Sequence, residues 1–130
     1  IVGFNEFRTF GLDRMENLEV KTQTFTPDNK LDPTELFCQT IGLVYSLNSV
    51  QNVVLSFTPS QGKYIKTLPL HASQQVLVDN ENECRISIHV SPNYELVQQI
   101  LKHGETVKVI EPQWMAEEIK CILKRNLEQY

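Results

Sequence analysis

The chain has 130 residues, a length that fits one domain, or one small domain together with the remainder of another. Its 12 basic and 16 acidic side chains give a net charge of -4, and the basic residues form no continuous run. This composition excludes a protein that holds duplex DNA mainly through its phosphates. Hydrophobic residues make up 41% of the chain, which is ordinary for a soluble domain, and no apolar run approaches the ~20 residues that span a bilayer. We therefore expect a cytoplasmic protein that does not enter a membrane.

The cysteines point to no disulfide framework and no metal site. Cys38, Cys84 and Cys121 are odd in number and far apart, and no two of them form a Cys-x-x-Cys pair. The three histidines match no metal-ligand spacing either. We predict reduced thiols and no cofactor.

In chain order, the first expected elements are three β-strands. Residues 1–4 end one strand, residues 5–6 turn, and residues 7–12 return as a second strand. Leu18, Val20 and Thr22 alternate with polar residues, which predicts a third strand with one wet face.

The second of these strands contains Arg8 and is followed closely by Arg14. Arg8, Phe10, Leu12 and Arg14 share a parity, so a regular strand places two cations and two large apolar groups on one face. Such a face suits an anion that also stacks, such as a nucleotide or a nucleic-acid strand. The plain alternative is that both arginines pair with neighbouring surface carboxylates.

A helical linker is expected to follow. Asp32 before Pro33 is typical of a helix N-terminus and predicts a short helix. A polar stretch then leads to a boundary that we place near residues 46–51.

The remaining chain predicts an α+β domain with strand, helix, strand, strand, helix and strand in that order. Thr58 and Pro59 begin the first helix, Pro69 ends it, and Asn93 caps the second helix. This order is that of the ferredoxin-like βαββαβ fold. A final helix from about Gln113 carries more apolar surface than a free tail needs, so it must pack on this domain or on a neighbour.

Few residues of this second part suggest chemistry. His71 and Gln74 lie in a loop rich in hydrogen-bonding side chains, and loops on a rigid scaffold often carry binding groups. His103 before Gly104 is expected to serve a helix C-terminus, where the helix dipole favours a cation. No nucleophile motif and no glycine-rich phosphate loop is present, which predicts that the chain is not an enzyme.

The stretch Arg8-Thr9-Phe10-Gly11-Leu12-Asp13-Arg14-Met15 resembles the second half of a WYL domain, the sensor module of many bacterial transcription regulators. Four later stretches resemble the C-terminal extension that follows WYL domains: Thr67-Leu68-Pro69-Leu70-His71-Ala72-Ser73-Gln74, Pro92-Asn93-Tyr94-Glu95-Leu96, His103-Gly104 and Val109-Ile110-Glu111-Pro112. The Trp-Tyr-Leu tripeptide of the family is absent, and Gly11 stands where many members have a further basic residue.

The resemblance implies a domain order. Residues 1–30 would be the C-terminal part of an Sm-like β-barrel, residues 31–50 a helical linker, and residues 51–130 the ferredoxin-like extension. We expect a C-terminal fragment of a longer regulator, whose N-terminal helix-turn-helix domain would bind DNA.

The resemblance also implies a function. The chain would be the effector-sensing and oligomerising region of the regulator, and would bind a nucleic-acid or nucleotide-like ligand through Arg8 and Arg14. Phe10, His71 and Gln74 join this candidate site from their residue chemistry. We expect a homodimer joined through the N-terminal strands, with a separate contact through the final helix. The alternative is a pure protein-interaction module without a small ligand.

Overall fold

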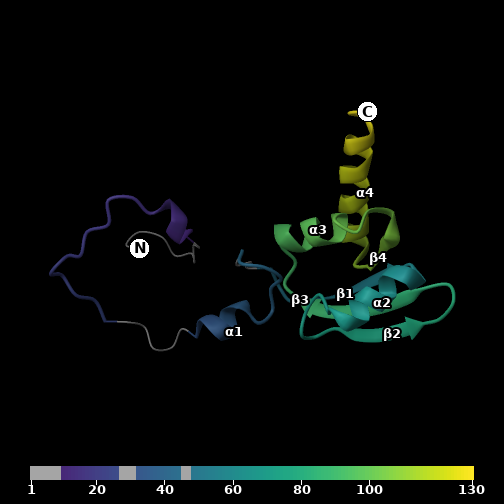
Figure 1. The fold of residues 1–130 in the computed structure, drawn as a ribbon, viewed down its shortest axis with the longest axis horizontal. Helices are drawn as coiled ribbons and strands as arrows, with labels where there is room; N and C mark the ends of the chain where they lie inside the picture. The colour runs from purple at the N-terminus through teal and green to yellow at the C-terminus, as the bar shows by residue number, and fades with distance from the viewer. Residues whose placement is uncertain (1–9, 27–31, 45–47) are drawn as a thin grey trace.

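The computed structural model describes residues 10–26, 32–44 and 48–130 of the chain. Its centre is a four-stranded antiparallel sheet, with strand order β2-β3-β1-β4 (Figure 1). The strands are β1 (Gln51–Phe57), β2 (Gln75–Asp79), β3 (Cys84–Val90) and β4 (Val107–Glu111).

Alternation in the two central strands separates a core face from an open face. In β3, Cys84, Ile86 and Ile88 are fully buried, whereas the residues between them are polar. The register sets Val53 of β1 opposite Ile88 and Leu55 opposite Ile86, so the apolar side chains of both strands lie on the same face.

Three helices cover the core face. They are α2 (Pro59–Thr67), α3 (Tyr94–Leu101) and α4 (Gln113–Leu127), and each adds buried apolar side chains to one continuous core. Local sequence sets where they begin, because Thr58 Oγ1 accepts a hydrogen bond from Gln61 N at 3.4 Å and Asn93 Oδ1 accepts one from Leu96 N at 2.8 Å. The mixed α+β class predicted from the sequence is confirmed.

The C-terminal helix projects away from the sheet. Figure 1 shows α4 rising from its junction with β4, with the C-terminus at its far end. Met115 and Ile119 in its first half are buried, whereas Leu123 and Leu127 are 48% and 75% exposed. Only part of the apolar surface of α4 is therefore buried against the rest of the chain.

Two shorter helical segments precede the sheet: the 3-10 turn Leu12–Arg14 and α1 (Pro33–Phe37). The strand predicted around Leu18, Val20 and Thr22 is wrong, because residues 15–26 contain no strand and Val20 is 94% exposed. Alternation favours a strand only where a neighbouring strand supplies backbone hydrogen bonds, and no described segment does so here.

Candidate functional site

The structure changes the geometry of the arginine motif. Residues Leu12–Arg14 form a 3-10 turn, in which Arg14 N donates to Gly11 O at 3.2 Å. The predicted common strand face of Phe10, Leu12 and Arg14 is therefore wrong, because side chains in such a turn do not alternate across a strand. Phe10 is 60% exposed, Arg14 is exposed, and Arg8 lies outside the described residues.

His71 is fixed by hydrogen bonds on both ring nitrogens. Ser73 N donates to His71 Nδ1 at 3.1 Å, so Nδ1 is the acceptor, and Nε2–H donates to Cys38 O at 2.9 Å. The imidazole thus ties the loop between α2 and β2 to the segment that follows α1.

Gln74 also has a structural role. Its Nε2 donates to Ile65 O at 2.9 Å, and its Oε1 accepts from Leu70 N at 2.9 Å. The amide closes the loop onto the end of α2, and both of its polar atoms are engaged. Figure 1 shows the segment of residues 10–26 away from the sheet and its loops, so the structure does not bring the described part of the arginine motif, Phe10 to Met15, together with the loop between α2 and β2.

A set of hydrogen bonds between distant segments was not predicted from the sequence. It lies where β3 leads into α3, and it holds residues 38–44 and 48, which we call the docked linker. Glu95 Oε2 accepts hydrogen bonds from Leu43 N at 2.7 Å and from Val44 N at 2.6 Å. Asn93 Nδ2 donates to Ile41 O at 2.9 Å and to Val44 O at 3.0 Å. One turn of α3 therefore holds the linker backbone by both its donors and its acceptors.

Ser91 and Asn48 complete this clamp. Ser91 is 4% exposed, its N donates to Gln39 O at 2.6 Å, and its Oγ donates to Asn48 O at 2.6 Å. Asn48 Nδ2 in turn donates to Pro92 O at 2.8 Å. Asn93 was predicted as a helix cap, and both Asn93 and Glu95 stand in a stretch that resembles the extension of WYL domains. Neither pattern predicted the contact with the linker, because a carboxylate in the first turn of a helix is common whether or not a distant backbone docks on it.

Two hollows flank α4. A groove of about 330 Å³ lies between α3, β4 and α4, and its lining is mainly apolar: Ile100, Leu101, Gly104, Val107, Lys108, Val109, Ala116, Ile119, Lys120 and Leu123. A cleft of about 380 Å³ lies between Asn48, α3 and α4, and it is more polar: Asn48, Pro92, Asn93, Tyr94, Val97, Gln98, Trp114, Glu118 and Ile122.

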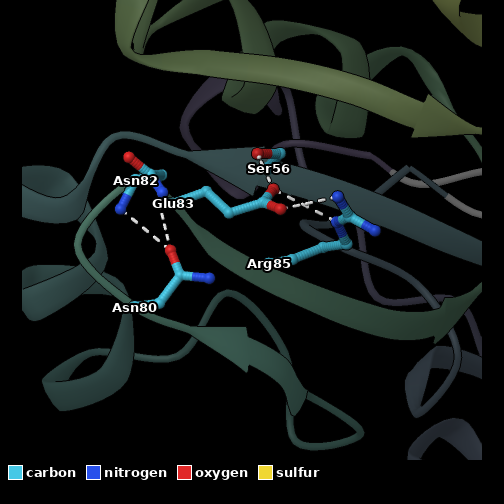
Figure 2. Close-up of polar contacts among 5 residues, drawn as sticks. All are labelled: Ser56, Asn80, Asn82, Glu83 and Arg85. Atoms are coloured by element: carbon cyan, nitrogen blue, oxygen red, sulfur yellow. Dashed lines mark hydrogen bonds and ion pairs between the residues drawn. The ribbon is translucent and has the colours of Figure 1, made fainter.

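A polar network on the open sheet face involves the only Arg of the sheet. Figure 2 shows Glu83 between Ser56 and Arg85, with Ser56 Oγ donating to its carboxylate at 2.6 Å and Arg85 Nη2 pairing with it at 2.6 Å. The Ser56 hydrogen bond and the Arg85 guanidinium lower the pKa of Glu83. Since its guanidinium is paired with a carboxylate, Arg85 is not an open anion site.

Asn80 orders the turn beside this network. Its Oδ1 accepts from Asn82 N at 2.8 Å and from Glu83 N at 3.0 Å, as the dashed lines of Figure 2 show. The β2–β3 hairpin and the network thus form one structural unit.

The environment of His103 differs from the one that the sequence predicted. Its ring packs edge-on against the ring of Phe57, with the two ring centroids 5.4 Å apart. Its Nε2 is buried with no hydrogen-bond partner among the residues described. Burial, with a smaller effect of Lys102, lowers its pKa. His103 does follow the end of α3, where its N donates to Ile100 O at 3.1 Å, but burial disfavours the cationic form that was expected there.

No group of three metal-binding side chains occurs in the part of the chain that the structure describes. Within that same part, no helix is long and apolar enough to cross a bilayer.

Comparison with known families identifies the larger part of the chain. The model of the WCX domain matches residues 49–127, which is more than half of the sequence. No curated protein matches the chain. The matched range contains β1 to β4, the apolar groove, all of the cleft lining except Asn48, and the α3 side of the linker clamp. It also covers the part that resembles the extension following WYL domains. The chain belongs to the WCX domain family.

Proposed function

We propose that this chain is the C-terminal regulatory region of a WYL-type transcription regulator and that it acts by joining a second copy of itself through α4. The WCX match supports the regulatory context. The net charge of -4 fits a partner other than the DNA backbone. The proposal assigns the chain no catalytic step.

The finer fold assignment is part of this proposal. The order β1, α2, β2, β3, α3, β4 and the antiparallel strand order β2-β3-β1-β4 support a ferredoxin-like domain. α4 is then an addition to that domain. It begins two residues after β4 and is the longest helix described.

The exposed apolar surface of α4 carries the oligomerisation proposal. Leu123 is 48% exposed and lines the apolar groove, and Leu127, one turn further along, is 75% exposed. A solvent-exposed apolar stripe continuous with an apolar groove is typical of a surface that binds another protein. In this arrangement Leu127 of one copy would lie against the groove of the other.

The charges of α4 support a second copy as the partner. Glu117 lies in its first half and Lys124 in its second half, and helical spacing places both beside the stripe of Leu123 and Leu127. When two such helices pair antiparallel through this stripe about a two-fold axis, Glu117 of each copy faces Lys124 of the other. A helix of this pattern is therefore complementary to itself.

Sedimentation equilibrium on the chain and on the double variant Leu123→Glu, Leu127→Glu tests the proposal. We expect a concentration-dependent dimer for the unmodified chain and a monomer for the variant. Arg125→Glu is the control for an added negative charge. It adds negative charge on the side of α4 away from Leu123 and Leu127 and removes no apolar surface, so it should weaken the dimer by roughly fivefold or less. A monomeric unmodified chain, or a double variant that dimerises as well as the parent, would contradict the proposal.

Effector binding at the arginine motif is the second candidate function. Its support is the exposure of both Phe10 and Arg14, which leaves a cation and a stacking surface four residues apart open to a ligand. Titration of a fluorescently labelled single-stranded DNA should then give weaker binding to Arg14→Ala than to Arg125→Ala, which removes the same charge elsewhere. Equal affinities for the two variants would exclude Arg14 from the site.

A further inference from the structure

The cleft between α3 and α4 has the size and the lining of a small-molecule site. Its volume of about 380 Å³ lies within the range of ligand pockets, and it is bounded by apolar, aromatic and polar side chains together. It shares no lining residue with the apolar groove on which the oligomerisation proposal rests.

Two aromatic side chains line this cleft and remain open to solvent. Trp114 is 44% exposed and Tyr94 is 68% exposed, whereas Val97 at the base is 7% exposed. The indole is held in place without a ligand, because Trp114 Nε1 donates to Gln51 Oε1 at 3.1 Å. A fixed and exposed indole beside an apolar base is a preformed contact surface for a ligand.

The charge of the cleft limits the class of ligand. Glu118 is the charged residue of its lining, and no Lys or Arg is among the described residues that line it. Neither ion pair found in the described part of the chain involves Glu118. A phosphate or carboxylate would meet an uncompensated negative charge here. A cation would gain the carboxylate and the faces of two aromatic rings.

The cleft also touches the linker clamp. Asn48 and Asn93 line it. Asn48 belongs to the docked linker and is held by Ser91 Oγ, whereas Asn93 holds the linker through the bond from its Nδ2 to Ile41 O. A molecule in the cleft would contact the linker, α3 and α4 at once. Its binding would favour the docked form of the linker by mass action.

We propose that the cleft lined by Tyr94, Trp114 and Glu118 is a binding site for an organic cation, an ammonium group on an aromatic or alkyl body. The ammonium lies at Glu118, and the apolar body lies against Trp114 and over Val97. The proposal is independent of oligomerisation, so its failure and the failure of the dimer proposal are separately visible.

Intrinsic fluorescence is a direct probe, because Trp114 is the single tryptophan of the chain. Phenethylammonium and its uncharged counterpart 2-phenylethanol are matched ligands of nearly equal shape, to be titrated at constant ionic strength. We expect a saturable change in Trp114 emission with phenethylammonium, and an affinity for 2-phenylethanol lower by roughly fivefold or more, because the alcohol lacks the charge that cation–π contact and Glu118 recognise.

Two carboxylate variants complete the experiment. Glu118→Gln should weaken phenethylammonium binding by roughly fivefold, whereas Glu117→Gln, which neutralises the neighbouring carboxylate outside the lining, should leave the affinity unchanged. Calorimetry with Tyr94→Leu provides a readout that does not depend on tryptophan and should show weaker binding. Equal binding of amine and alcohol, equal binding to both carboxylate variants, or no saturable response up to 10 mM (an upper concentration on the order of weak-ligand Kd values) would each overturn the proposal.

Discussion

Asn93 performs two tasks with one amide group. Its Oδ1 caps α3 by accepting from Leu96 N, while its Nδ2 holds the carbonyl groups of Ile41 and Val44. Together with Glu95 it makes the start of α3 the point at which the linker is attached. Any substitution at Asn93 therefore alters both the helix and the linker, and cleaner tests lie at the linker residues themselves.

Gly42→Ala tests the linker clamp at a single residue. Gly42 has φ +82°, and a Cβ there would lie 2.2 Å from Glu95 Cδ, so the carboxylate must move away from Leu43 N and Val44 N. We expect the amides of Leu43 and Val44 to lose protection from hydrogen exchange, as measured by NMR. Gly104→Ala is the control, because Gly104 has φ +55° but open space at its Cβ, and it should cost about 1 kcal/mol of backbone strain while those amides stay protected. Unchanged protection in Gly42→Ala would show that Glu95 does not hold the linker.

His103 predicts a pH dependence of stability. Its pKa is lowered by burial in the folded chain, so between that value and the ordinary value of about 6.5 the unfolded chain binds more protons than the folded chain. The free energy of unfolding should therefore fall as the pH drops through 6.5. His103→Gln should show a smaller fall than the parent between pH 7.5 and pH 5.5 (a window of about one unit on either side of that value) in urea denaturation.

The control for this prediction is His89→Gln, which removes an exposed histidine from the open sheet face. The fall in its free energy of unfolding at acid pH should exceed that of His103→Gln, because His103 is the histidine whose ring nitrogen is buried without a partner among the described residues. If His103→Gln keeps the full fall in stability at acid pH, other groups cause it.

At the scale of elements, close packing of α2 on β3 depends on a missing side chain. A Cβ on Gly62 would lie 2.2 Å from Cys84 Cβ, and Cys84 is fully buried. The glycine thus lets the helix approach the strand. This close contact with Cys84 explains why a glycine occurs inside α2, although glycine in a helix is unfavourable by about 1 kcal/mol relative to alanine.

Gly62→Ala should therefore destabilise the domain despite its better helix propensity. Overpacking of a buried contact costs about 1–3 kcal/mol, and the propensity gain offsets about 1 kcal/mol of it. We expect a net loss of up to about 2 kcal/mol in the free energy of unfolding, measured by chemical denaturation. Lys63→Ala, on the exposed side of the same helix, should be close to neutral. A Gly62→Ala variant more stable than the parent would show that α2 does not pack this tightly.

At the scale of the whole molecule, one core joins the sheet to all three of its helices. It includes Leu55 and Ile86 from the sheet, Leu96 from α3 and Met115 from α4, each fully buried. The docked linker adds Ile41 to this core, so the folded unit extends to the N-terminal side of the matched family range. Removing α4 would expose the core, which makes the helix both a structural part and a candidate interface.

The reactivity of the three cysteine thiols tests the packing of this folded unit. Cys84 is fully buried and burial raises its pKa, whereas Cys38 and Cys121 are exposed. An aromatic disulfide reagent at neutral pH should modify two thiols quickly and the third only as fast as the domain opens. The Cys84→Ala variant should show the fast phase alone. Fast reaction of all three thiols in the folded chain would contradict the burial of Cys84.

Local patterns in the sequence determined the elements of residues 51–130. The alternation in β3, the caps at Thr58 and Asn93, and the end of α2 before Pro69 each depend on neighbours within a few residues, so they are readable without the fold. Alternation around Val20 carried the same signal and was misleading, because a strand also needs a partner that periodicity does not supply.

Only the tertiary structure decided what the polar side chains do. His71 and Gln74 look like binding groups in the sequence, but the fold uses their hydrogen bonds to close a loop and to hold the segment after α1. Glu95 stands in a stretch that resembles the WYL extension, but the sequence shows the contact partner of neither Glu95 nor Trp114. Those partners lie about 50 and 60 positions away and are brought to them by the fold. Within residues 51–130, the sequence by itself determined where helices and strands form, since those elements depend on short-range backbone preferences. The sites were decided by long-range packing, because a side chain has a function only in relation to the distant groups it meets.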